Sequence, residues 1–317
     1  GMRERLSSLL ILGLTLPFLG KPVHIDDANF VAMAEHAASD PWRPHNFTIN
    51  WQGTSESAFY VLSNPPGIAW WLSPFAHAST VVMHLWMMPW LFLAMWGAAR
   101  LGRAIGTNPS SSILLLCGAP ISIIAAQALT PDLPLLALTL AGFGGLLTGA
   151  PNKRWVFALT LGTASLFRYS GLVLIPLIFL LPLSRLERCR SMVWASIPIC
   201  GLMLHDWVAY DQVHLFAMMA FQSVSNSGTE LAHKAVALVA ALGGVAALPI
   251  LCWNRKKYSF LGGITGAIVG FAAATLTEQS NWATTGTVLF TAAGAASLAG
   301  VAQAKDTIDR FLIAWML

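Results

Sequence analysis

Long apolar runs recur along almost the whole chain and constrain its fold more than any other feature. Most are close to the roughly 17 to 25 residues that a helix needs to cross a ~30 Å hydrocarbon layer. Only 10% of the 317 residues are charged, against about 25% in a soluble domain. The sequence therefore predicts an all-α polytopic membrane protein with about ten transmembrane helices in a single domain, residues 1–317. The predicted spans are residues 6–20, 78–99, 111–128, 133–149, 155–167, 169–183, 191–209, 233–252, 259–277 and 283–303.

The positions of the basic residues predict how the chain is oriented. With a cytoplasmic N-terminus, 14 of the 18 Lys and Arg residues fall on the cytoplasmic side, the side that favours them. Ten of the 14 carboxylates fall outside. We expect a multi-pass protein of the plasma (bacterial inner) membrane with its active face periplasmic or extracellular. No basic stripe with interleaved aromatic residues is present, so nucleic acid is not an expected partner. The four basic residues outside are Lys21, Arg43, Arg168 and Lys234.

One large external loop, residues 21–77, follows the first span. Its apolar residues at helical spacing predict an interfacial helix over residues 28–38. Residues 155–167 and 169–183 are too short to cross upright, and a hairpin with Arg168 at its tip is expected. Glycines at 262, 266 and 270 predict close packing against a neighbouring helix. Residues 306–317 are read as an incomplete or interfacial tail.

Asp26 and Asp27 are the strongest candidates for catalysis. They lie a few residues beyond the first span, where partial desolvation raises a carboxyl pKa and suits a general base. The alternative interpretation is structural, because Asp at this position caps the N-terminus of the helix that follows.

Three segments in sequence order resemble the type C glycosyltransferases, a family that includes protein O-mannosyltransferases and lipid A aminoarabinose transferases. Residues 24–30 read His-Ile-Asp-Asp-Ala-Asn-Phe, where the family has Asp-Glu-x-x-Tyr or Asp-Glu-x-x-Phe, so Asp27 replaces the family's Glu. Residues 64–66 (Asn-Pro-Pro) precede Trp70 and Trp71. Residues 130–135 and 166–172 are similar to two later family segments. The resemblance covers roughly residues 6–180.

The resemblance implies an inverting enzyme that moves a sugar from a polyprenyl-phosphate donor to an acceptor hydroxyl on the outer face of the membrane. The acceptor is a lipid, a glycan or a protein. Asp26 is then the expected base, with Asp27 beside it. Arg168 and Lys234 are the expected cations for the donor phosphate. The expected supporting residues are Asp132, Tyr169, His24 and Asn64.

Each of these residues also has a structural interpretation. Arg168 can extend to the headgroups, Lys234 can pair with Glu230, and Asp132 can cap a helix. The sequence establishes no cofactor. A divalent metal at Asp26 and Asp27 remains an open prediction, although no His-x-x-x-His spacing supports it.

Two other classes of function remain open on the sequence. A secondary transporter also places charges within the membrane, but it usually shows two related halves, and none is evident here. A non-catalytic membrane subunit derived from such an enzyme is the third interpretation.

Overall fold

The computed structural model describes residues 1–24, 26–51, 53–223, 263–272, 287–289, 291–293 and 295–296. Its contacts divide the chain into two units, Gly1–Gln222 and Ser223–Leu317. Lys234, the predicted span 233–252 and the tail 306–317 lie outside the described residues. Most of the described residues lie in the first unit.

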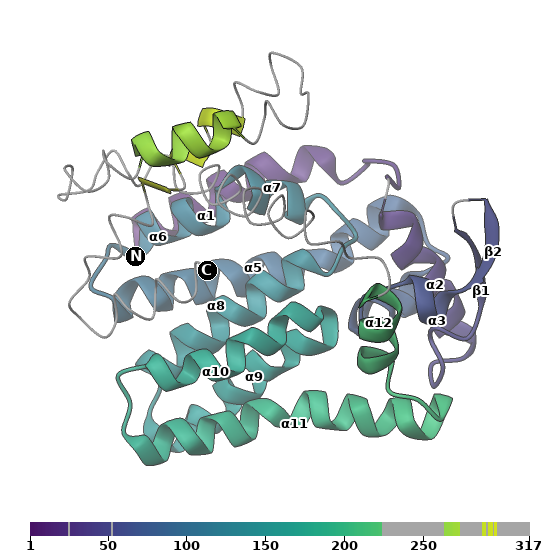
Figure 1. The fold of residues 1–317 in the computed structure, drawn as a ribbon. Coiled ribbons are helices and arrows are strands. Elements are labelled where there is room, and N and C mark those ends of the chain that lie inside the picture. The colour runs from purple at the N-terminus through teal and green to yellow at the C-terminus, as the bar shows by residue number, and fades with distance from the viewer. Residues whose placement is uncertain are drawn as a thin grey trace. The chain divides into compact units, whose positions relative to one another are not determined.

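The first unit begins with a layer of three helices (Figure 1). Helix α1 (Met2–Thr15) continues into the 3-10 turn η1 (Leu16–Phe18) and packs against α6 (Pro109–Cys117) and α7 (Pro120–Ala126). Helices α6 and α7 are bent by 71° at their junction. Pro120 starts α7 and has no N–H to continue the hydrogen bonds of α6, which accounts for the break within the predicted span 111–128.

Four further helices lie side by side below this layer in Figure 1 and form the core. Their order of packing is α5 (Thr80–Ala104), α8 (Asp132–Thr148), α9 (Arg154–Phe167, after the turn η3, Pro151–Lys153) and α11 (Arg185–Tyr210). Gly162 allows the closest approach, because a Cβ there would overlap the carbonyl oxygen of Ala195 on α11. Small residues at helix contacts are typical of packing within membranes.

A hairpin is predicted around Arg168, and the structure shows that the helix is interrupted at this residue. Helix α9 ends at Phe167, Arg168 is extended (φ −152°), and η4 (Tyr169–Val173) begins directly after it. The chain continues through α10 (Leu174–Leu177) and η5 (Ile178–Leu180). Beyond α11 comes α12 (His214–Ser223).

The loop predicted to be external carries most of the remaining structure. It contains α2 (Asp27–Ser39), α3 (Ala58–Val61), α4 (Gly67–Leu72) and η2 (Ser73–Phe75). It also contains an antiparallel hairpin of β1 (Thr48–Trp51) and β2 (Thr54–Ser57), in which Thr48 pairs with Ser57. The fold is thus mostly helical, and the prediction of a purely α fold missed this hairpin.

The predicted interfacial helix is present as α2, but a protein surface covers its apolar face. Phe30, Met33, Ala34 and Ala37 are all buried, and α2 packs against α4 and η2. The periodicity identified the face correctly. It could not show whether lipid or a neighbouring helix covers that face, because either one buries the same side chains.

Two described helices, α5 and α11, are long and apolar enough to cross a membrane, and the bent pair of α6 and α7 makes a third if it is one span. The prediction of about ten spans is not supported. Among the described helices α1, α8 and α9 have 14, 17 and 14 residues. Pro176 lies where residues 169–183 divide into short helical pieces rather than one helix.

The glycine pattern near the C-terminus is partly confirmed within the second unit. A Cβ at Gly266 or Gly270 would approach Thr291 closely, so a neighbouring segment does pack on this face. Gly262 lies outside the described residues.

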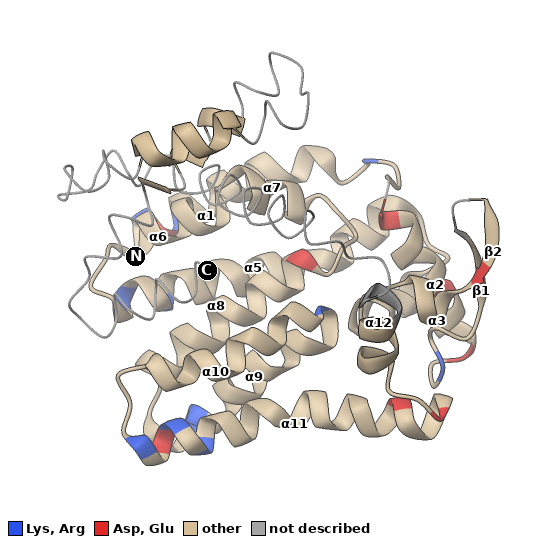
Figure 2. Cartoon of the chain, viewed as in Figure 1, with Lys and Arg blue, Asp and Glu red and all other residues tan. Residues whose placement is uncertain are grey.

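Charges separate along the helices of the first unit. Figure 2 shows most Lys and Arg residues at the end where α5 stops and α11 begins, and most carboxylates at the opposite end. Residues 100–103 and 185–190 contribute much of the basic end.

Candidate functional site

A cavity of about 230 Å³ brings together side chains that are far apart in the sequence. We call it the acidic cavity. Four predicted site residues line it: Asp26, Asn64, Asp132 and Arg168. They come from the start of α2, the segment between α3 and α4, the start of α8 and the break after α9. The other lining residues are Asn29, Phe30, Val61, Leu62, Ser63, Thr130 and Pro131.

Asp26 lies at the N-cap position of α2, yet its side chain makes no capping hydrogen bond. The residue is exposed and faces the cavity. Its carboxylate is therefore accessible to a ligand, which the structural alternative of an N-cap would have prevented.

Asp27 has the opposite environment. The residue is 2% exposed, and its carboxylate accepts hydrogen bonds from the backbone N–H of Leu129 (3.0 Å) and of His24 (3.4 Å). These bonds join the chain after α1 to the segment before α8. Asp27 is absent from the cavity lining, and this environment is that of a structural anchor.

Arg168 and Asp132 form an ion pair at the cavity, with the guanidinium donating to the carboxylate. Both side chains remain more than two-fifths exposed. A partly exposed pair of this kind contributes little to stability, roughly 0 to 1 kcal/mol. The guanidinium keeps further N–H groups for an anionic ligand, and Asp132 fixes its position.

The remaining predicted residues lie around the cavity rather than in its lining. His24 is exposed and contributes its backbone N–H to Asp27. Tyr169 follows Arg168 directly, and its hydroxyl contacts Nδ1 of His214 at 2.7 Å. No placement is described for Lys234.

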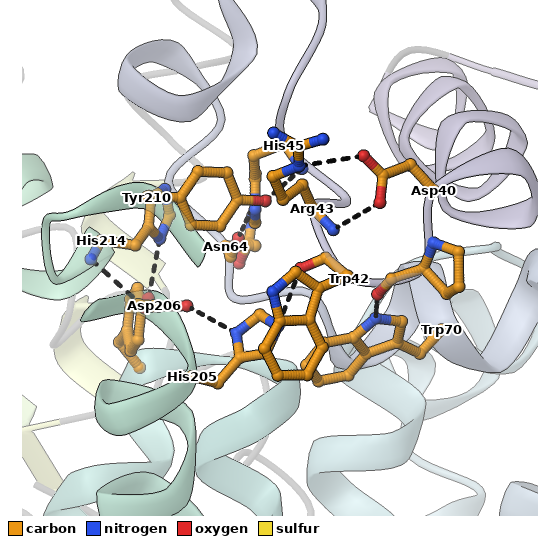
Figure 3. A network of polar contacts seen from close by, with 12 residues as sticks. Asp40, Trp42, Arg43, His45, Asn64, Trp70, His205, Asp206, Tyr210 and His214 are labelled. Carbon is orange, nitrogen blue, oxygen red and sulfur yellow. Dashed lines mark hydrogen bonds and ion pairs between the residues drawn. The ribbon is translucent and has the colours of Figure 1, made fainter. Parts of the chain in front are cut away.

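A second group of polar side chains, which sequence reasoning missed, lies beside residues 62–64. We call it the histidine cluster and define it as His45, His205, Asp206, Tyr210 and His214; Figure 3 shows it with its neighbours. The rings of His45 and His214 stack at 4.4 Å between centroids, and both residues are at most 2% exposed.

Hydrogen bonds tie this cluster together and to the cavity wall. His45 donates through Nε2 to the carbonyl oxygen of Asn64 (3.1 Å) and through its backbone N–H to the hydroxyl of Tyr210 (3.0 Å). Asp206 accepts from the backbone N–H of His214 (3.3 Å), and its carboxylate lies 3.2 Å from Nδ1 of His205.

Burial keeps the two stacked imidazoles neutral. It lowers the pKa of His45 to about 3, with the neighbouring His214 acting in the same direction. Burial also lowers the pKa of His214 to about 4, although the Asp206 carboxylate opposes this shift. No local pattern in the sequence marks the cluster, because residue 45 and residues 205–214 are brought together only by tertiary folding.

A metal site at Asp26 and Asp27 is not formed by the described side chains. The Asp27 carboxylate already accepts from two backbone N–H groups, and among the described residues no three His, Cys, Asp or Glu side chains are grouped to hold a metal ion. The acidic cavity can instead offer an accessible carboxylate, a guanidinium and amide groups to a small polar ligand.

Comparison with family models, curated proteins and solved structures finds no match to this chain. The resemblance to type C glycosyltransferases therefore rests on the sequence segments 24–30, 64–66, 130–135 and 166–172 alone.

Proposed function

We propose that this protein is a membrane glycosyltransferase that moves a sugar from a polyprenyl-phosphate donor to a hydroxyl of a lipid, glycan or protein acceptor. The observation that carries the proposal is the acidic cavity. An accessible carboxylate, Asp26, and a guanidinium, Arg168, line one small space although they are distant in sequence. A base and a cation for a leaving phosphate are the two groups that this transfer needs.

The membrane setting is part of the same proposal. Two or three described helices satisfy the requirements of a span, and basic residues concentrate at one end of the first unit. We assign the basic end to the cytoplasm, following the preference of Lys and Arg for that side. The acidic cavity then opens on the periplasmic or extracellular face of the bacterial inner membrane. The proposed topology keeps the sequence prediction of about ten spans, some of which fall in segments outside the described residues.

Asp26 acts in this proposal as the general base. Its carboxylate takes the proton from the acceptor hydroxyl as the hydroxyl oxygen attacks the anomeric carbon, with inversion there. The bond between that carbon and the phosphate oxygen breaks, and the polyprenyl phosphate leaves with the electron pair. A general base of this kind contributes roughly a 10²- to 10⁴-fold acceleration.

Arg168 stabilises the departing phosphate in this proposal. Charge developing on an oxyanion is stabilised best by donors that are already in place. The ion pair with Asp132 holds the guanidinium at the cavity before the donor binds. A volume of about 230 Å³ is below the roughly 300 to 1,000 Å³ of most ligand pockets, so it fits the polar head of a donor and not its lipid chain.

The test uses the full chain in nanodiscs and a panel of radiolabelled decaprenyl-phosphate sugars. D26N is expected to lower transfer by at least 100-fold, the low end for a general base, while decaprenyl phosphate still binds. R168Q is expected to weaken that binding. The matched control is E35Q, which neutralises an exposed carboxylate on the same helix, α2.

Three outcomes would reject the proposal. If sugar transfer survives D26N, Asp26 is not the general base. Flux of a solute without any covalent product identifies a transporter. A chain that binds decaprenyl phosphate equally well with and without Arg168 has no donor site at this cavity, as expected of a non-catalytic subunit.

A further inference from the structure

The two walls of the acidic cavity that carry Asn64 and Arg168 have little regular structure of their own. Residues 62–66 connect α3 to α4, and Leu62 is already extended (ψ 99°). Arg168 is an extended residue between α9 and η4. The backbone N–H of Arg168 donates to the carbonyl oxygen of Ala164, and its carbonyl oxygen accepts from Gly171, so the backbone there is tied to α9 and η4. Asn64 lies outside the helices, so contacts with other parts of the chain hold its wall and orient the Arg168 side chain.

Each wall is held by one member of the same stacked pair of imidazoles. The carbonyl oxygen of Asn64 accepts from Nε2 of His45 at 3.1 Å. On the other wall, the hydroxyl of Tyr169, next to Arg168, contacts Nδ1 of His214 at 2.7 Å. The two rings stack at 4.4 Å with an interplanar angle of 25°. A shift of either ring is therefore transmitted to the other and to the opposite wall.

The pair is anchored to a long helix. Asp206 on α11, itself 3% exposed, accepts from the backbone N–H of His214 at 3.3 Å. Tyr210 at the end of α11 accepts from the backbone N–H of His45 at 3.0 Å. Helix α11 has 26 residues and packs along α9, so it supplies a fixed reference for both rings.

We infer that His45 and His214 are positioning residues that couple the two walls of the acidic cavity, holding Asn64 directly and Arg168 through Tyr169. They do not line the cavity, so they act through the residues that do. A site that recognises a phosphate works only when its cation is held within about 0.5 Å of the productive position. The part of this inference that concerns the phosphate rests on the proposed function.

The variants separate coupling from general stability. Y169F removes one oxygen atom and with it the contact of Tyr169, the neighbour of Arg168, with His214. H214N keeps a polar group near the position of Nδ1, whereas H214L removes it. H45Q keeps a donor near the position of Nε2. The matched controls are Y60F, whose hydroxyl bonds to Gln212 away from the cavity, and H77Q, an exposed histidine.

The first measurement is hydrogen–deuterium exchange of the full chain without ligand. H214L is expected to raise exchange in both walls, in peptides covering residues 58–66 and 164–173, while H214N stays near the native rate. If H214L raises exchange only around residue 214, the two walls are not coupled and the inference fails. This result does not depend on what the cavity binds.

The second measurement is the affinity for decaprenyl phosphate in nanodiscs. Y169F and H214L are expected to weaken binding about tenfold, equivalent to about 1.4 kcal/mol, while H214N, H45Q and the controls stay within about twofold. Native affinity in Y169F together with weak binding in R168Q overturns the positioning role and leaves the donor site intact. Native affinity in R168Q instead overturns the proposed function. Should H214L fail to fold, Y169F decides the question.

Discussion

The acidic cavity and the histidine cluster share a wall at Asn64 but differ in every physical respect. In the cavity the charged side chains of Asp132 and Arg168 are more than two-fifths exposed, and Asp26 makes no capping bond. In the cluster His45, Asp206 and His214 are at most 3% exposed and are hydrogen-bonded to their neighbours. Exposed groups with unused hydrogen-bonding capacity are available to a ligand, whereas buried and partnered groups fix geometry.

The same contrast separates two adjacent residues. Asp26 faces the cavity, and Asp27 bonds to the backbone of Leu129 and His24. A helix turns by about 100° per residue, so neighbours along the chain point in different directions. Proximity in sequence thus says little about shared function here.

Acidification should destabilise the protein through the histidine cluster, and it gives the largest expected effect. The pKa values of His45 and His214 are about 3 and about 4 in the folded chain, below the 6.5 of a free histidine. As the pH falls through 6.5, the unfolded chain binds protons and the folded chain does not. The stability that the neutral imidazoles contribute above pH 6.5 is therefore lost from pH 6.5 down to about pH 4 for His214 and about pH 3 for His45.

The loss expected from pH 7 to pH 5 is about 2 kcal/mol for each histidine. Thermal unfolding midpoints of the solubilised protein at both pH values measure it. The double variant H45Q/H214N cannot take up these protons, so its midpoint should fall much less on acidification. Equal falls in the native and double-variant proteins would contradict the role assigned to the cluster.

Truncating Asp27 should destabilise the protein more than truncating Asp26. D27A leaves the buried N–H of Leu129 without its acceptor and removes two bonds to a carboxylate, a cost of about 3 kcal/mol. D26A removes an exposed side chain and should change stability by less than about 0.5 kcal/mol. Unfolding midpoints measured side by side provide the test. A D26A variant that unfolds as readily as D27A would show that the two carboxylates do not differ as described.

Sequence reasoning named four residues that line the cavity but not the support behind them. Asp26 was identified from its position after a span and Arg168 from the tip of the predicted hairpin, whereas Asn64 and Asp132 came from the family resemblance, at a turn and at a helix start. Such signals mark chain reversals, and chain reversals at one end of a helical layer lie close together. The cavity follows from that common end.

The histidine cluster and the number of spans could not be obtained in this way. His45 meets His214 only because α12 folds back, and nothing within either segment encodes that contact. The apolar runs predicted where helices form but not where they are interrupted. Pro120 and Pro176 lie where predicted spans divide into shorter pieces, and hydropathy alone does not distinguish a broken helix from a continuous one.

A close backbone contact should make the Arg168 wall sensitive to Gly67. A Cβ at Gly67 would overlap the carbonyl oxygen of Leu166, two residues before Arg168. G67A should therefore cost about 2 kcal/mol, as expected when a well-packed site is overfilled, and should weaken decaprenyl phosphate binding as well. The control is G201A on α11, where a Cβ meets no atom within 4 Å. There alanine should stabilise the helix by about 0.5 to 1 kcal/mol.

If G67A lowers the stability and G201A raises it, the Arg168 wall is held by packing as well as by the histidine pair. A G67A variant with native stability and native binding would mean that α4 and α9 can separate without moving the guanidinium.

The smallest effect is expected on the opposite side of the cluster, at Trp70. Its indole N–H donates to the carbonyl oxygen of Pro41 at 2.8 Å, and its ring meets His205 edge-on at 5.5 Å. W70F keeps most of the ring and removes the donor, so it should cost about 1 kcal/mol. W207F is the control, because that side chain is 62% exposed on α11.

Trp70 contacts the cluster through His205. Asp206, in contrast, bonds directly to the backbone N–H of His214, a member of the stacked pair. His205 donates to the carbonyl oxygen of Trp42 at 2.8 Å, so it anchors the segment after α2 and not the cavity wall. W70F should accordingly lower the unfolding midpoint slightly and leave the affinity for decaprenyl phosphate unchanged. Weaker binding in W70F would mean that the whole cluster, and not only its stacked imidazoles, sets the position of Arg168.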